Sequence, residues 1–163
     1  MAKKVALYGI LTSLALIFGY IESLFSISFI APGVKLGLAN SVALLLLCFK
    51  DFKGALLVNI TRILLSALLF SSPFSLVFSL TAGVLSVMVM RLLSGIKSVS
   101  VVGFSIAGAA VHNLVQLTVA ALLFGRAVLY YMPFLLVSAI FGGGIIGILS
   151  SIIFKKIKTN IKI

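Results

Sequence analysis

Long apolar stretches alternate along this chain with short breaks made of Pro, Gly or clusters of charge. Breaking the chain at these positions predicts six helices, over residues 5–27, 35–49, 54–70, 74–93, 100–124 and 132–154. A helix needs ~20 residues to cross a bilayer, so the second and third are short. We expect the turn at Ala31-Pro32-Gly33 to dip into the membrane. The pattern predicts an all-α integral membrane protein, with residues 1–163 as a single transmembrane domain.

Composition strengthens this interpretation. Hydrophobic residues make up 63% of the 163 positions and charged residues only 9%. A soluble domain of this size has too little interior to hide so much apolar surface. The lipid bilayer must therefore be part of the solvent of this protein.

The basic residues indicate how the helices are oriented. With both termini in the cytoplasm, the inner side receives ten of the thirteen basic residues: Lys3, Lys4, Lys50, Lys53, Arg91, Lys97, Lys155, Lys156, Lys158 and Lys162. The outer side receives only Lys35 and Arg126. This asymmetry follows the positive-inside rule, and it requires an even number of crossings. We predict six transmembrane helices with both ends in the cytoplasm.

The net charge of +11 does not indicate nucleic acid. The basic residues sit in short clusters between apolar segments, and they form no continuous basic face with interleaved aromatics. Cys48 is the only cysteine and His112 the only histidine, so the usual zinc-binding sets cannot be assembled. We expect no metal site and no nucleic-acid partner.

Arg62 lies near the middle of an apolar stretch, where a charge costs roughly 2.5–3.5 kcal/mol on insertion scales. Such residues usually face a protein interior or a wet cavity. The third predicted helix places Asn59, Arg62 and Ser66 on one face. The fifth gathers another polar set, which we place at the same depth as one cavity wall: His112, Asn113 and Gln116.

Arg62 needs a negatively charged partner, and the chain has only two carboxylates. Asp51 lies in an inner loop between lysines, where we expect it to be solvated. Glu22 lies near the outer end of the first helix, within reach of an extended arginine. Two alternatives follow: Arg62 binds an anionic ligand, or it forms a structural pair with Glu22. Asn113 and Gln116 are also compatible with simple helix–helix hydrogen bonding.

A second cation lies at the start of the second predicted helix. Lys35 stands between Gly33 and Gly37, where free backbone N–H groups and the helix dipole favour an anion. Asn40 follows on the same helix, facing the cavity. By itself, Lys35 is better explained as a side chain that extends to lipid phosphates. Together with Arg62, it favours an anionic ligand that enters from outside.

The first helix carries a narrow stripe of small residues: Ala2, Ala6, Gly9 and Ser13. Such a stripe lets another helix approach closely, either within the bundle or in a second membrane protein. The sixth helix has its own small residues around Gly142-Gly143-Gly144, Gly147 and Ser150. There we expect internal packing or a kink.

Sequence motifs for catalysis are missing. The chain has no phosphate-binding Gly-rich loop, no paired acidic motif for Mg²⁺ and a diphosphate, and no Ser/His/Asp triad at one depth. The sequence therefore predicts a protein that is not an enzyme and carries no cofactor.

Three segments resemble the Gx transporter family, which is also labelled heptaprenyl diphosphate synthase component I. They are residues 32–40 (PGVKLGLAN), the helix around Arg62, and residues 110–116 (AVHNLVQ). The family is similar to the substrate-binding S components of energy-coupling factor (ECF) transporters, which are six-helix bundles. The resemblance implies that the stripe on the first helix docks on a transmembrane coupling subunit with two ATPase subunits.

The same resemblance implies a multi-pass protein of the bacterial cytoplasmic membrane that captures a small molecule from outside. An anionic prenyl or quinone precursor would suit Arg62 and Lys35. Two alternatives stay open at this level. One is a stand-alone secondary transporter, and the other is a membrane accessory subunit of heptaprenyl diphosphate synthase.

Overall fold

The computed structural model describes residues 2–24, 37–70 and 72–161. The described residues form six α-helices, joined in part by two short 3₁₀ segments, and the all-α prediction is confirmed. The elements are α1 (Ala2–Leu24), η1 (Leu38–Asn40), α2 (Ser41–Cys48), α3 (Phe52–Leu69), α4 (Pro73–Ser94), α5 (Val101–Phe124), η2 (Arg126–Tyr131) and α6 (Met132–Ile161). The expected turn at Ala31-Pro32-Gly33 lies outside the described residues.

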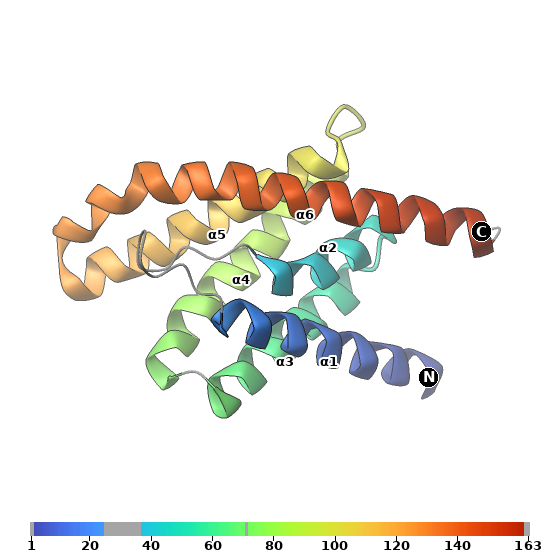
Figure 1. Ribbon diagram of the computed structural model, residues 1–163, viewed down its shortest axis with the longest axis horizontal. Coiled ribbons are helices and arrows are strands. Elements are labelled where there is room, and N and C mark those ends of the chain that lie inside the picture. Colours follow the sequence, from blue (N-terminus) through green and yellow to red (C-terminus); the bar gives the residue numbers. More distant parts are fainter. Residues whose placement is uncertain (1, 25–36, 71, 162–163) are drawn as a thin grey trace.

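The helices form one bundle around the short helix α2. In Figure 1, α5 and α6 lie side by side on one flank and α1 lies on the other, with α2 between them. Helix α5 packs against both α4 and α6, whereas α1 packs against α3. Both termini lie at the same end of the bundle, as an even number of crossings requires.

Helix α2 departs from the predicted span 35–49. The backbone at Gly37 is left-handed, with φ of 80°, so no helix can run through it. The α-helix starts only at Ser41 and has 8 residues, about 12 Å at 1.5 Å per residue. Five other helices are long and apolar enough to cross a membrane. Helix α2 alone is too short to cross a bilayer.

The sequence of α2 explains its central place. It is apolar on all sides, which is typical of a fully buried helix. Five of its side chains are buried: Val42, Ala43, Leu44, Leu46 and Leu47. They pack with Ala15 of α1, Val58 of α3 and Ile146 of α6 in the main hydrophobic core. The core thus lies around α2, and the N-terminal end of this helix is free to line a cavity.

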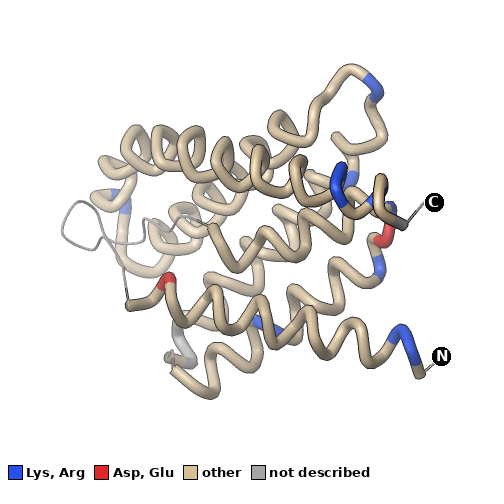
Figure 2. Tube along the Cα trace, turned by 45° about the vertical axis from the view of Figure 1, so that its right-hand side comes forward, with Lys and Arg blue, Asp and Glu red and all other residues tan. Residues whose placement is uncertain are grey.

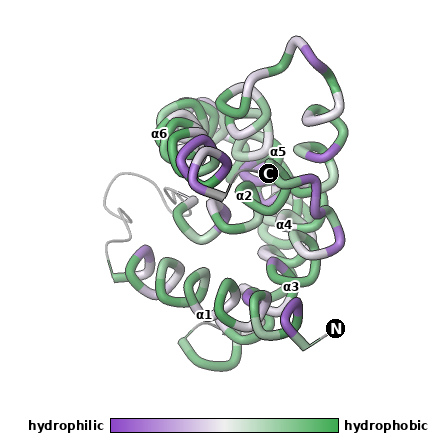
Figure 3. The backbone as a smooth tube through the Cα atoms, turned by 90° about the vertical axis from the view of Figure 1, so that its right-hand side faces the viewer, coloured by the Kyte–Doolittle hydropathy of each residue, from purple (hydrophilic) through white to green (hydrophobic). Residues whose placement is uncertain are grey.

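Hydrophobic residues make up most of the helices (Figure 3), and many large apolar side chains are exposed. Large side chains such as Leu68 and Leu122 are 81% and 80% exposed. Such a surface would be unstable in water but is well suited to lipid. The chain is therefore a multi-pass membrane protein.

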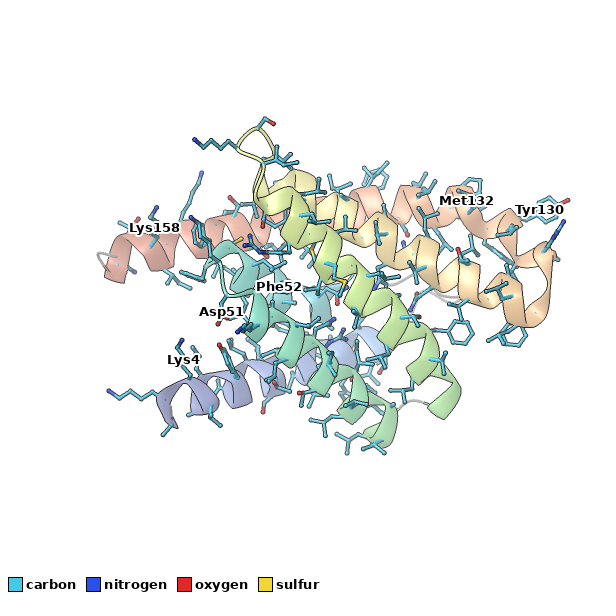
Figure 4. The ribbon with its side chains drawn as sticks, turned by 180° about the vertical axis from the view of Figure 1, so that it is seen from behind. Lys4, Asp51, Phe52, Tyr130, Met132 and Lys158 are labelled. Atoms are coloured by element: carbon cyan, nitrogen blue, oxygen red, sulfur yellow. The ribbon has the colours of Figure 1, made fainter. Side chains whose placement is uncertain are left out.

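The two ends of the bundle differ in their content of basic residues. Lys and Arg positions gather at the end that carries the termini (Figure 2). Figure 4 shows Lys4, Asp51 and Lys158 at this end, and Tyr130 and Met132 at the other. Tyr130 is exposed, as expected for an aromatic residue at the membrane interface. The arrangement agrees with the sidedness predicted from the basic residues.

Asp51 corrects one expectation, because its side chain is not simply solvated. It caps the N-terminus of α3, where its Oδ1 accepts a hydrogen bond from Gly54 N–H at 3.0 Å. Its Oδ2 accepts another from the Tyr8 hydroxyl of α1, at 2.6 Å. The Tyr8 hydrogen bond is the largest cause that lowers the pKa of Asp51 below its ordinary value. Asp51 therefore ties α1 to the start of α3.

The glycines of α6 pack against α5. A Cβ added at Gly143 would lie 2.8 Å from the Ile106 Cα, and one at Gly147 would lie 2.8 Å from the Val102 Cα. Only glycine allows the two backbones to approach so closely. Internal packing, one of the two readings of this segment, is confirmed.

Candidate functional site

A cavity of about 130 Å³ lies between the helices, beside the N-terminal end of α2. Residues from α1, η1, α3, α4, α5 and α6 contribute to its wall. Its polar lining residues are Glu22, Ser23, Asn40, Arg62, Ser66, Ser75, Ser79, His112, Asn113 and Ser138. Because a bundle interior in lipid has few polar groups, their concentration in one cavity marks a candidate binding site.

Arg62 is the basic residue among the described lining residues. Its Nη2 donates to the Asn40 Oδ1 at 3.1 Å and to the Asn59 Oδ1 at 2.8 Å. Both acceptors are neutral amides, so neither compensates the charge. Its Nε is shielded from solvent and has no hydrogen-bond partner. The guanidinium is thus held in place but is not neutralised.

Glu22 also lines the cavity, but it forms no salt bridge with Arg62. The carboxylate accepts a hydrogen bond from the N–H of Gly37. Its charge remains close enough to Arg62 for a Coulombic interaction. The predicted structural pair is therefore absent, and Glu22 instead fixes the residue that precedes η1. Gly37 N–H, expected to be free for a ligand, is already bound.

Asn59 lies behind Arg62 and not in the cavity wall. Its side chain is 1% exposed and holds the guanidinium through its amide oxygen. Its Nδ2 is buried without a hydrogen-bond partner. A Cβ at Gly83 of α4 would lie 2.9 Å from this Nδ2, so the amide packs against α4 where glycine leaves room for it. Asn59 is a positioning residue for Arg62.

Helix α5 brings two of its three predicted polar residues to the cavity. His112 and Asn113 both line it. Asn113 also holds α6 in place, because its Nδ2 donates to the Leu135 carbonyl at 2.8 Å and to the Ser138 Oγ at 3.3 Å. Gln116 is half-buried and lies outside the cavity lining, one helical turn from His112. Gln116, expected to share this wall, is not among the residues that line the cavity.

Sequence reasoning missed the contribution of α4 and α6. Ser75 and Ser79 stand one turn apart on α4, and Ser138 comes from α6. The i, i+4 spacing of the two α4 serines was the available signal. Serine is common in membrane helices, where it often bonds its own backbone, so this signal is weak.

The remaining predicted residues lie elsewhere. Lys35 falls outside the described residues. The stripe residues of α1 are all exposed: Ala2, Ala6, Gly9 and Ser13. A Cβ at Gly9 would meet no atom within 4 Å. The stripe is therefore on the surface of the described bundle and does not serve as internal packing.

Within the described residues no group of three His, Cys, Asp or Glu side chains could share a metal ion. The functional groups that line the cavity are a fixed guanidinium, a carboxylate, a histidine and several hydroxyl and amide groups. Such a set binds and orients a polar ligand through hydrogen bonds and charge.

The fold and this cavity define a class: a helical, multi-pass membrane protein with a cavity between its helices that is lined in part by polar side chains. The chain belongs to the family described as heptaprenyl diphosphate synthase component I, whose model matches residues 11–153. The match confirms the family resemblance of the sequence. No curated protein and no solved structure matches the chain.

Proposed function

We propose that this chain is the substrate-binding membrane subunit of an ECF uptake transporter. It captures a small molecule with an anionic group, of the vitamin, isoprenoid-precursor or quinone-precursor type. One observation carries this proposal. Arg62 is a cation that lines the cavity, and its hydrogen bonds go to neutral amides.

Physical chemistry supports a ligand at Arg62. A charge removed from water is costly unless an opposite charge and hydrogen bonds compensate it. Here the two amide oxygens bond only to Nη2, and Nε has no partner. The buried Ser66 Oγ in the same wall also has none. A ligand carboxylate or phosphate in the cavity would place an opposite charge beside the guanidinium.

The surface of α1 supports a partner in the membrane. Its small residues are exposed, and no atom covers Gly9. The partner we propose is the transmembrane coupling subunit of the transporter, with two ATPase subunits bound to it on the cytoplasmic side. The site of action is the cytoplasmic membrane of a bacterium. On this proposal the chain itself catalyses no reaction.

The test of the binding proposal is ligand retention by purified protein. We expect native mass spectrometry of the wild-type protein in mild detergent to show a bound small molecule. Arg62→Ala should lose it, with affinity lower by at least ~30-fold, because truncating one partner of a buried charge pair costs 2 kcal/mol or more. Arg91→Ala is the matched control, since Arg91 is exposed in the last turn of α4. Equal retention by both variants would refute the role of Arg62.

The family description favours a second candidate function. The chain matches a family described as a component of heptaprenyl diphosphate synthase. An accessory subunit of that enzyme should copurify with a soluble catalytic subunit, and it should do so independently of the cavity. Arg62→Ala would leave such an association unchanged. A stand-alone secondary transporter would instead take up its substrate without any partner.

A further inference from the structure

Two side chains of opposite charge line the same cavity. Glu22 of α1 and Arg62 of α3 are the acidic and the basic residue among the described lining residues. Glu22 is 9% exposed. A wall with one charge of each sign differs from a simple anion site, because a carboxylate repels a second negative charge.

The two charges do not neutralise each other directly. Arg62 bonds to amide oxygens, while the carboxylate of Glu22 accepts from a backbone N–H. Within the described residues no salt bridge joins them, although both face one small space. A desolvated charge is stabilised by an opposite charge close to it. A ligand with one charge of each sign could supply such a partner to both residues.

We infer that the ligand is a small zwitterion, whose anionic group binds Arg62 and whose cationic group binds Glu22. This inference rests on the proposed function: it keeps the anionic group of the ligand and adds a cationic group, which an isoprenoid diphosphate lacks. Amino acids and related amino-carboxylates have the required chemistry.

The size of the cavity agrees with a compact ligand. Its volume of about 130 Å³ is below the ~300–1,000 Å³ of pockets for drug-sized ligands. The wall between the polar groups includes Ile63, Phe70 and Leu76, which would contact a short apolar part. A diphosphate would bring several negative charges to a wall that offers one described cation beside a carboxylate.

The charge pattern is tested with matched sets of three probes. Each set holds an amino acid, the acid that lacks its amine, and the amine that lacks its carboxylate. Suitable sets are γ-aminobutyrate, butyrate and propylamine; leucine, isocaproate and isoamylamine; and phenylalanine, hydrocinnamate and phenethylamine. Affinity for purified protein is measured by isothermal titration calorimetry.

We expect the wild type to bind at least one amino acid tenfold or more tightly than its matched acid or amine. Glu22→Gln keeps an oxygen for the Gly37 N–H and removes the charge, so the fold should be retained. In this variant the preference for the amino acid over the acid should fall to near unity. Arg62→Gln should abolish the preference for the amino acid over the amine.

Equal or tighter binding of the matched acids by the wild type would overturn the zwitterion and leave the anion-binding proposal intact. Binding of no probe by the wild type would also overturn it. The proposed function is decided separately, by whether the native protein retains any small molecule and recovers its transporter partners.

Discussion

At the scale of single residues, the site depends on how Arg62 is held. Two asparagines accept hydrogen bonds from its Nη2, and neither carries charge. An aspartate at either position would have neutralised the guanidinium within the protein. Asparagine fixes the direction of the side chain while leaving its charge to act on something else. On the proposed function, the amides in place of carboxylates leave the charge of Arg62 available to a ligand.

Asn59→Asp tests this choice directly. The Asn59 Nδ2 has no hydrogen-bond partner, so its replacement by oxygen sacrifices no hydrogen bond. The new carboxylate would pair with Arg62 and compete with the anionic group of the ligand. We expect a folded protein whose ligand affinity is at least tenfold lower, about 1.4 kcal/mol. Asn160→Asp adds the same charge at an exposed position of α6 and should bind normally. Undiminished binding by Asn59→Asp would show that the charge of Arg62 is not used.

The link between Tyr8 and Asp51 predicts a pH dependence. The pKa of Asp51 is lowered in the folded protein, first by the Tyr8 hydrogen bond. A carboxylate with a lowered pKa stabilises the fold above its unfolded pKa of about 4, and this contribution is lost as the pH falls through the folded pKa. Tyr8→Phe should therefore lower the thermal midpoint at neutral pH.

The difference between the wild type and Tyr8→Phe should shrink as Asp51 becomes protonated below about pH 4. Thermal unfolding in detergent from pH 3 to 8 measures it. Asp51→Asn is the reference, since it lacks the titrating group. If the difference in thermal midpoint stays constant over the whole pH range, the stabilisation by the Tyr8 hydroxyl does not depend on the charge of Asp51.

At the scale of elements, α2 is the feature that the apolar pattern could not define. Residues 35–49 are apolar enough for a span, but hydrophobicity does not distinguish a short buried helix from a transmembrane one. The deciding contact is long-range: the Glu22 carboxylate of α1 binds the N–H of Gly37, where the backbone is left-handed. The other helices are bounded by Pro, Gly, Ser or charged residues. For most of their ends, the predicted boundary lies within a few residues of the observed one.

The contact between α5 and α6 gives a prediction at this scale. Gly143→Ala and Gly147→Ala should each destabilise the protein by ~1–3 kcal/mol, because the added Cβ meets backbone atoms of α5. Gly144→Ala is the matched control, since a Cβ there meets no atom within 4 Å. Thermal unfolding of the three variants measures the effect. Equal stability of all three variants would mean that α5 and α6 can move apart to accommodate a Cβ at little cost in free energy of unfolding.

At the scale of the whole molecule, the candidate site and the α1 stripe are separate surfaces. The cavity lies inside the bundle, while Gly9 and its neighbours on the stripe are exposed. Sequence periodicity found both the Arg62 face and the stripe. It could not place Gln116 outside the cavity or Ser75 and Ser79 inside it, because the rotation of α4 and α5 is set by packing between helices. It also could not show that Glu22 binds Gly37 in preference to Arg62.

The separation of the two surfaces predicts that docking can be lost without loss of the ligand. Gly9→Trp adds bulk to an exposed position with no neighbours. We expect normal folding and ligand retention but no association with the coupling subunit. Leu122→Trp, at another highly exposed position, should associate normally. Ligand loss in Gly9→Trp would indicate that the two surfaces are one unit.

The capture-subunit function is tested most directly by a mild-detergent pull-down of the tagged protein from its native membranes, with mass spectrometry of the recovered proteins. We expect a transmembrane coupling subunit and two ATPase subunits with the wild type and with Leu122→Trp, and their loss with Gly9→Trp. Recovery of a soluble prenyl synthase in their place, or of the protein alone, would contradict the capture-subunit function.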